Sequence, residues 1–198
     1  MPGLPSRRAL LTVAGALSLT ASFGCRRAAD LPPLGSVGTF SLTDQAGRAV
    51  KAESMRGQVW AAAFFFTRCP TVCPRITRRM RDLQQAAAKD DVKLQLVSFS
   101  VDPDNDTPAV LTAYAKQYNA DLATWRFLTG DLEVVRKTSE HGFKLALDGK
   151  ATAGAEHFGL FHGSHLVLVD GAGQIRGYYR TSEDSQMAQL LKDAALVA

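Results

Sequence analysis

The chain has 198 residues, of which 23 are basic and 19 acidic, so its formal net charge is +4. This surplus is too small, and looks too evenly spread along the sequence, to indicate a nucleic-acid-binding protein. Hydrophobic residues make up 46% and charged residues 21%, which excludes a disordered or fibrous chain and fits one globular domain with a full core.

The first 25 residues are predicted to be an export signal. Arg7 and Arg8 precede a mostly apolar stretch over 9–23, which is shorter than the roughly 20 residues that a membrane-spanning helix needs. Residues 6–11 resemble a twin-arginine export signal. The glycine before Cys25 makes this point similar to the cleavage site of a bacterial lipoprotein, in which the cysteine is lipidated. We therefore expect export and, more narrowly, lipidation of Cys25.

A tether and a hairpin are predicted to follow. Residues 26–37 contain Pro and Gly without an apolar period, which is typical of a linker. The folded domain, residues 38–198, is therefore expected to begin near Gly38. It opens with alternating residues at 39–42 and turn-forming residues at 44–47, which is the pattern of a β-hairpin.

Strands and helices then alternate. The continuous apolar run at 59–66 predicts a strand buried on both faces. Pro74 is expected to begin a helix, because proline lacks the N–H group that would go unpaired there. The later elements are expected in this order: a strand at 92–101, a helix begun at 106–108, a strand at 125–128, a helix begun by Asp131, strands at 166–170 and 174–179, and a helix at 186–197. This order predicts an α/β fold of thioredoxin-like layout, with a mixed central sheet, helices on both faces and an N-terminal hairpin.

Three aspartates alternate before the second helix. Asp102, Asp104 and Asp106 have the spacing with which a calcium-binding EF-hand loop begins. Thr107 and Pro108 stand where such a loop needs its glycine turn, and no downstream Glu completes it. Calcium binding is therefore not predicted, and Asp106 is expected to cap the helix.

Two cysteines carry the chemistry that the sequence suggests. Cys69 and Cys73 lie between the most buried strand and the start of a helix, where N–H groups and the helix dipole stabilise a thiolate. Arg68 and Arg75 are expected to act in the same direction. A structural disulfide is an alternative, although closing so short a loop stabilises weakly. The spacing also lets two thiolates converge on one soft ion such as Cu(I) or zinc.

Two thiolates rarely make a selective metal site alone, so a third ligand is sought among the four histidines. His162 and His165 stand just before an apolar strand, from which either could reach the cysteine pair. Each is more often only a hydrogen-bonding residue when judged by itself. His141 is expected to be structural and His157 to be solvated.

Three blocks of the sequence resemble the Sco/SenC family. Residues 64–74 read Phe-Phe-Phe-Thr-Arg-Cys-Pro-Thr-Val-Cys-Pro, similar to that family's C-P-x-x-C-P signature. Residues 100–108 read Ser-Val-Asp-Pro-Asp-Asn-Asp-Thr-Pro, similar to its second block. His162 with the following stretch at 173–179 resembles the third block. The resemblance covers about residues 38–195.

The resemblance implies a thioredoxin-like copper protein of the bacterial cell envelope. Together with the export signal and Cys25, it leads us to expect a protein on the periplasmic side, held to the membrane by a lipid anchor. It implies one copper, Cu(I) or Cu(II), bound by the thiolates of Cys69 and Cys73 and the imidazole of His162. It further implies a role in assembling the binuclear copper centre of cytochrome c oxidase, as chaperone or as thiol reductase. The implied partner is the copper-receiving subunit of that oxidase or another copper protein.

Two positions depart from the family pattern. Thr71 replaces an Asp between the cysteines, and Phe161 replaces the Asp that often precedes the histidine. Both changes remove negative charge near the predicted ligands, so copper affinity and redox tuning are expected to differ.

Other functions remain open from the sequence. The first is a thiol-disulfide oxidoreductase in which Cys69 attacks and Cys73 resolves. A redox or copper sensor is another. A peroxidase related to peroxiredoxins is disfavoured because Thr67 stands two residues before Cys69, where three are needed. His162 discriminates among these functions, since copper binding needs it and dithiol exchange does not.

Overall fold

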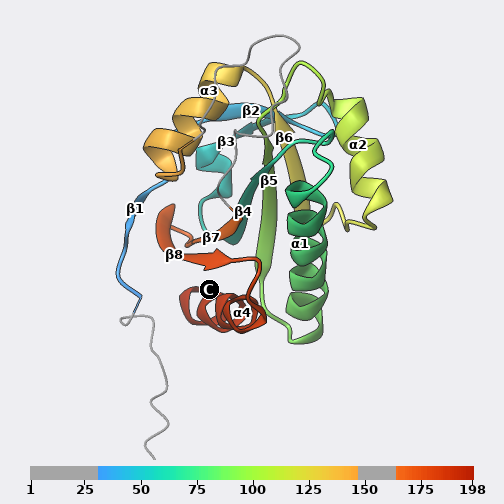
Figure 1. Cartoon of the computed structure of the whole chain (residues 1–198). Helices are drawn as coiled ribbons and strands as arrows, with labels where there is room; N and C mark the ends of the chain where they lie inside the picture. The colour runs from blue at the N-terminus through green and yellow to red at the C-terminus, as the bar shows by residue number, and fades with distance from the viewer. Residues whose placement is uncertain (1–30, 147–163) are drawn as a thin grey trace, which may run out of the picture.

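The computed structural model describes residues 31–146 and 164–198. Its strands form one mixed sheet in the order β1-β8-β7-β4-β5-β6-β2-β3 (Figure 1). The strands are β1 (Gly35–Ser36), β2 (Ser41–Asp44), β3 (Ala49–Lys51), β4 (Val59–Phe65), β5 (Leu94–Ser100), β6 (Trp125–Thr129), β7 (His165–Val169) and β8 (Gln174–Arg180). The α-helices are α1 (Val72–Lys89), α2 (Pro108–Gln117), α3 (Leu132–Lys137) and α4 (Asp184–Val197). None of the helices in these two ranges combines the length and the apolar character that crossing a membrane requires.

Strand β4 is the centre of the molecule, and every one of its residues is buried. Successive side chains of a strand point to opposite faces, so β4 contributes to two cores. Ala61, Ala63 and Phe65 pack with residues of α1, α2 and α4. On the other face, Trp60 and Phe64 pack with residues of α3 and the segment after it. The thioredoxin-like mixed sheet with helices on both faces is therefore confirmed.

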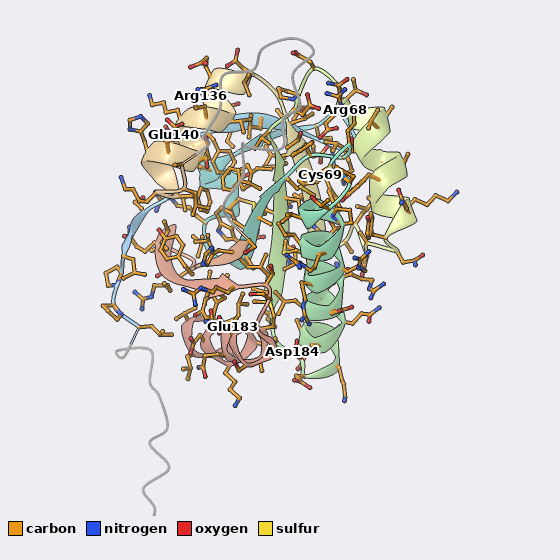
Figure 2. The ribbon with its side chains drawn as sticks, viewed as in Figure 1. Arg68, Cys69, Arg136, Glu140, Glu183 and Asp184 are labelled. Atoms are coloured by element: carbon orange, nitrogen blue, oxygen red, sulfur yellow. The ribbon has the colours of Figure 1, made fainter. Side chains whose placement is uncertain are left out.

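The directions of the strands bring three segments to one edge of the sheet. Strands β4, β5 and β6 are parallel, so their carboxyl ends meet at the same edge. Strand β7 is antiparallel to β4 and therefore begins at that edge. The β4–α1 loop with Cys69, the β5–α2 loop and the start of β7 thus lie together at the edge where Figure 2 shows Cys69 and Arg68.

Helix α1 begins two residues earlier than predicted. It starts at Val72, so Pro74 is its third residue and Cys73 lies inside its first turn. The N–H groups of the first four helical residues have no intrahelical partner, so proline loses no hydrogen bond at the third position either. The position of Pro74 is therefore compatible with a helix that starts at Val72 and with one that starts at Pro74 itself.

The segment predicted as a tether is partly folded. The N–H of Leu34 donates to the carbonyl of Ile175 at 2.8 Å, and that of Val37 donates to Gly173 at 3.1 Å. Leu31 and Val37 are buried. Residues 31–37 therefore belong to the folded domain, whose start was predicted at residue 38. A two-residue strand paired with the far end of the chain leaves no local apolar period that could reveal it.

Candidate metal centre

One strand-to-helix connection supplies both thiols of the predicted site. Cys69 lies in the loop after β4 and Cys73 in the first turn of α1, and both are free thiols. The backbone N–H of Cys73 donates to Cys69 Sγ at 3.4 Å. Their exposed fractions are 7% and 1%. The structure thus brings together the two predicted thiolate ligands in a site that water barely enters.

The two thiols have opposite electrostatic environments. Burial on its own would raise the pKa of Cys69, but hydrogen bonds from the backbone of Cys73, Thr71 and Val72 outweigh it and lower the pKa. Burial raises the pKa of Cys73 far above the usual thiol range, and the charges of Cys69 and Asp106 add to this rise. Cys69 is therefore the member of the pair that forms a thiolate more readily.

Arg68 and Arg75 were expected to stabilise the thiolate, but neither contributes to the lowered pKa of Cys69. The guanidinium of Arg68 is bound to Asp102, with an N–O distance of 2.8 Å. Arg75 is exposed on α1. The lowered pKa of Cys69 follows from the N–H groups at the start of α1, which is the part of the prediction that the structure supports.

The sequence led us to expect that Asp106 caps α2, but it does not. The hydroxyl of Thr107 takes that place and accepts from the N–H of Val110 at 3.4 Å. The Asp106 carboxylate is fully buried, and it accepts hydrogen bonds from the backbone N–H of Thr67 at 3.1 Å, from the Thr67 hydroxyl and from the Ser100 hydroxyl at 2.5 Å. Burial raises the pKa of Asp106 despite these donors.

Asp106 therefore fastens the cysteine loop to its neighbours. Thr67 stands two residues before Cys69, and the carboxylate ties it to the end of β5 and the start of α2. The ion pair between Arg68 and Asp102 is a second tie between the same two segments. Sequence reasoning missed this role because Asp106 and Thr107 both have capping side chains, and the spacing does not say which one turns inward.

A third tie holds the helical end of the site. The hydroxyl of Thr77 donates to the carbonyl of Cys73 at 2.9 Å and lies 2.8 Å from the Tyr114 hydroxyl of α2. Residues on both sides of the cysteine pair are therefore held by buried hydrogen bonds. Such support keeps a pair of ligands in place before the ion arrives.

Of the two histidines considered as copper ligands, the structure describes His165 but not His162. His165 is the first residue of β7 and is half-buried opposite Arg180 of β8. Burial, with Arg180 adding to it, lowers the pKa of His165. His162, predicted as the imidazole ligand, lies outside the described residues, as do His157 and Cys25. Within 31–146 and 164–198, no three His, Cys, Asp or Glu side chains are grouped to hold a metal ion.

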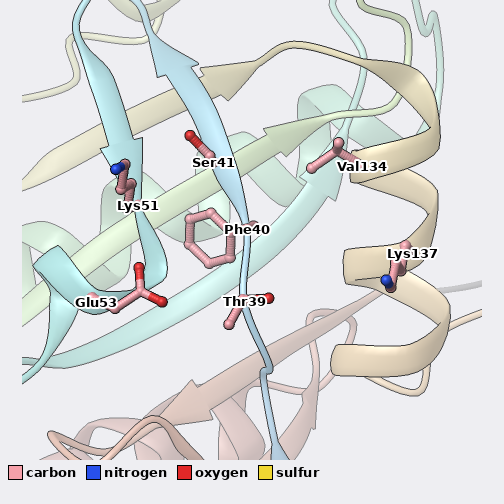
Figure 3. A pocket seen from close by; sticks show the side chains of 7 residues that line it. All are labelled: Thr39, Phe40, Ser41, Lys51, Glu53, Val134 and Lys137. Carbon is pink, nitrogen blue, oxygen red and sulfur yellow. The ribbon is translucent and has the colours of Figure 1, made fainter.

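An open groove lies away from the cysteines. It has a volume of about 710 Å³ and runs between β2, β3 and α3, with Phe40 at its floor and Lys51, Glu53 and Lys137 around it (Figure 3). Its rim carries charges of both signs and contains neither a cysteine nor a histidine. The groove therefore offers no soft metal ligand, and the candidate centre remains the cysteine pair.

Comparison with known proteins finds relatives along most of the chain. The family model described as SCO1/SenC matches residues 30–195. A SCO1 protein homolog of Bacillus subtilis is 33% identical over 155 residues, which are 78% of this chain and 78% of that protein.

Solved structures agree in fold. A SCO1/SenC family lipoprotein of Bacillus anthracis is 34% identical with a TM-score of 0.75, covering 83% of this chain and 96% of that one. BsSco, described as a cytochrome c oxidase assembly protein of the Sco family with a disulfide switch, is 32% identical with a TM-score of 0.71, covering 84% and 97%. Copper-bound ScoI of Bradyrhizobium japonicum is 26% identical with a TM-score of 0.66, covering 81% and 98%.

Proposed function

The chain belongs to the SCO1/SenC family, and from this premise we propose that it is a copper-binding assembly factor. It binds one copper ion, its cargo, through the thiolates of Cys69 and Cys73 and the imidazole of His162. The observation that carries this proposal is the contact of the Cys73 N–H with Cys69 Sγ at 3.4 Å, which joins two buried cysteines at the junction of the β4–α1 loop and α1. Two soft sulfur donors and an imidazole suit Cu(I) and Cu(II).

The position of β7 supports His162 as the third ligand. Strand β7 begins at the sheet edge where β4 ends, and its preceding residue, Ser164, accepts hydrogen bonds from the backbone and the hydroxyl of Thr181. His162 stands two residues before Ser164 in the sequence, and this is the reason for proposing it as the third ligand.

The protein residues have separate tasks in this mechanism. The thiols of Cys69 and Cys73 lose their protons when copper binds, so affinity is coupled to pH. Asp106 holds Thr67, and thereby the cysteine loop, in place. Thr71 occupies the N-cap of α1 without a side-chain hydrogen bond, so the helix start lacks the negative charge that an Asp would bring. We expect this to shift copper affinity and redox potential relative to family members with Asp there.

The destination of the copper and the location of the protein complete the proposal. BsSco is a cytochrome c oxidase assembly protein, and the Bacillus anthracis relative is a lipoprotein. We propose the binuclear copper centre of cytochrome c oxidase, or another copper protein, as the recipient. We also propose that the chain is exported to the periplasmic side of the envelope and anchored through a lipid on Cys25.

His162→Ala is expected to weaken Cu(II) binding by more than about 100-fold, because loss of a ligand exceeds the effect of losing an outer support. Cu(I) should be retained better, since the two thiolates remain. Spectra and competition titrations of His162→Ala and His165→Ala measure this, with His165→Ala as the matched control. If His165→Ala loses Cu(II) and His162→Ala does not, the assignment of the third ligand is wrong.

A second function is favoured by the unequal thiols. A thiol-disulfide oxidoreductase needs a readily ionised attacking cysteine and a protonated resolving one, and the pKa of Cys69 is lowered while that of Cys73 is raised. The His162→Ala variant separates the two functions. Dithiol exchange should survive this change, whereas Cu(II) binding should not.

Brief alkylation of the reduced protein tests the inequality of the thiols. Iodoacetamide at neutral pH is expected to modify Cys69 at least about tenfold faster than Cys73, because each pKa unit changes the thiolate fraction about tenfold. Mass mapping of the peptides measures both rates. The unfolded protein is the control, in which the two rates should converge; equal rates in the folded protein would contradict the assignment.

A further inference from the structure

Helix α1 presents two arginines that have no acidic partner. Arg75 and Arg78 are exposed, and neither forms an ion pair with any residue that the structure describes. The other arginines of this region are engaged, with N–O distances of 2.8 Å for Arg68–Asp102, 2.6 Å for Arg79–Asp184 and 2.6 Å for Arg81–Asp82. Arg75 and Arg78 are therefore two guanidinium groups available to an outside ligand.

The stability of the helix does not explain these arginines. The positive end of the helix dipole lies at the N-terminus, where acidic residues are favoured, yet the first turn of α1 contains none. Arg75 and Arg78 are also three residues apart, so they are neighbours on the helix surface and repel each other. The dipole therefore opposes Arg75, which lies in the first turn, and the mutual repulsion opposes both arginines.

Basic residues outnumber acidic ones on α1, and Arg75 and Arg78 are its two basic residues nearest to the cysteines in the sequence. Helix α1 contains five basic residues and one acidic residue, although the whole chain has a net charge of only +4. The even spread of charge expected from the sequence is therefore wrong. Arg75 and Arg78 follow Cys73 by two and five residues, which is about 3 and 8 Å along the helix axis. Figure 2 shows Cys69 at this end of α1.

We propose that Arg75 and Arg78 form a docking surface for an acidic protein partner, which they orient with its own metal ligands or cysteines toward Cys69 and Cys73. This inference rests on the proposed exchange of copper or electrons at the cysteine pair. Complementary charge next to a reactive site accelerates encounter by 10-fold to about 1,000-fold and selects the partner's orientation. Arg75 and Arg78 together form the basic face of α1.

A membrane surface fits the basic face less well. Each basic side chain near an anionic membrane contributes little, and stable attachment needs a larger cluster or an apolar face beside it. The large exposed hydrophobic residues of the described chain are Leu34, Val110 and Leu122, and none of them belongs to α1. The two charges of the basic face have no exposed large apolar residue of α1 beside them, so they fit a protein that carries two carboxylates better than they fit a membrane.

Exchange with synthetic peptides tests the docking surface without copper. The Cys69 thiolate of the reduced protein attacks the peptide disulfide, forming a mixed disulfide and releasing one peptide thiolate. Cys73 then loses its proton and displaces the second peptide sulfur, which leaves a protein disulfide and a reduced peptide. Two peptides with the same disulfide are compared, one flanked by Glu and the other by Gln.

The natural chain is expected to react about tenfold faster with the Glu peptide than with the Gln peptide at about 0.1 M salt. This ratio should fall toward one at about 1 M salt, where charges are screened beyond about 3 Å. Arg75→Gln with Arg78→Gln should bring the ratio near one already at low salt. Lys89→Gln with Lys93→Gln is the matched control and should keep the ratio. It removes the same charge from the far end of α1, where Lys89 lies about 20 Å from Arg75 along the axis, and from the segment just after the helix.

Three results would overturn the docking surface: no preference in the natural chain, a preference that survives loss of both arginines, or one equally lost in the lysine control. Sedimentation with phosphatidylglycerol vesicles is run in parallel, and arginine-dependent vesicle binding without peptide preference would assign the face to the membrane instead. Thermal unfolding confirms that the variants are folded. Copper is also counted on the same proteins, which separates the docking surface from the proposed copper binding. The peptide preference can hold while copper binding fails, and copper binding can hold while the peptide preference fails.

Discussion

Cys73→Ser is expected to bind copper more than about 100-fold more weakly than the natural chain, and Cys69→Ser likewise. A serine hydroxyl stays protonated at neutral pH and is a hard donor, so it does not replace a thiolate on Cu(I). Losing a ligand should exceed the 10-fold to about 100-fold effect of losing an outer support. Competition with a chromogenic Cu(I) chelator under anaerobic, reducing conditions measures the affinity.

Cys25→Ser is the control for this pair, because it removes a thiol that is not predicted to bind copper. The control should keep the affinity of the natural chain. Either of the two site variants holding copper as tightly as the natural chain would remove the thiolate pair from the account. Near-ultraviolet circular dichroism shows whether a variant that loses copper is still folded.

Asp106→Ala is expected to lower the free energy of unfolding by about 3 kcal/mol, because it leaves two part-buried donors of Thr67 and the buried hydroxyl of Ser100 without their acceptor. It should also weaken copper binding, since the loop before Cys69 loses its main tie. Urea unfolding measures the stability. Asp104→Ala is the matched control: Asp104 is exposed, so its loss should change stability by less than about 0.5 kcal/mol.

The pH dependence of an isosteric variant gives the same residue a second test. The pKa of Asp106 in the folded chain is raised above 3.8, mainly by burial. Its stabilising contribution is therefore fully present below pH 3.8 and is lost as the pH rises through the raised value. The stability advantage of the natural chain over Asp106→Asn should shrink as the pH rises from about 4 to about 7. An advantage that grows with pH would contradict the raised pKa.

The sequence predicts most of the fold because its strongest patterns are local. The apolar run that forms β4 can be satisfied only by burial on both faces, and it ends within one residue of its predicted end. Asp131 caps α3 as predicted, since its side chain accepts from the N–H of Val134 at 3.0 Å. In both cases the signal and the structure it specifies lie within a few residues of each other.

Predictions fail where the structure of a segment depends on a hydrogen-bond partner that is distant in the sequence. The strand at Gly35–Ser36 forms because Leu34 donates a hydrogen bond to Ile175 of β8 and Val37 donates one to Gly173, just before β8. No local pattern in the sequence records these partners. Asp106 turns inward because Thr67 and Ser100, on two other segments, offer it donors. Capping propensity alone points to Asp106 and Thr107 equally.

The candidate site follows the same division. The pairing of Cys69 with Cys73 at a helix start is predictable, because only three residues separate them in the sequence. The arrangement of charges around them is not predictable. Arg68 pairs with Asp102, whereas Arg75 forms no ion pair with any residue in 31–146 or 164–198. The third ligand, His162, stays a prediction.

The amount of copper bound by the reduced chain tests the proposed copper site directly. The protein is reduced, mixed with excess Cu(I) under anaerobic conditions and desalted, and metal and protein are then counted on the same sample. We expect one copper per chain, with Cys69 and Cys73 both protected from a thiol reagent. A desalted protein that carries no copper, or carries it while both thiols still react, would show that the two thiolates do not bind copper.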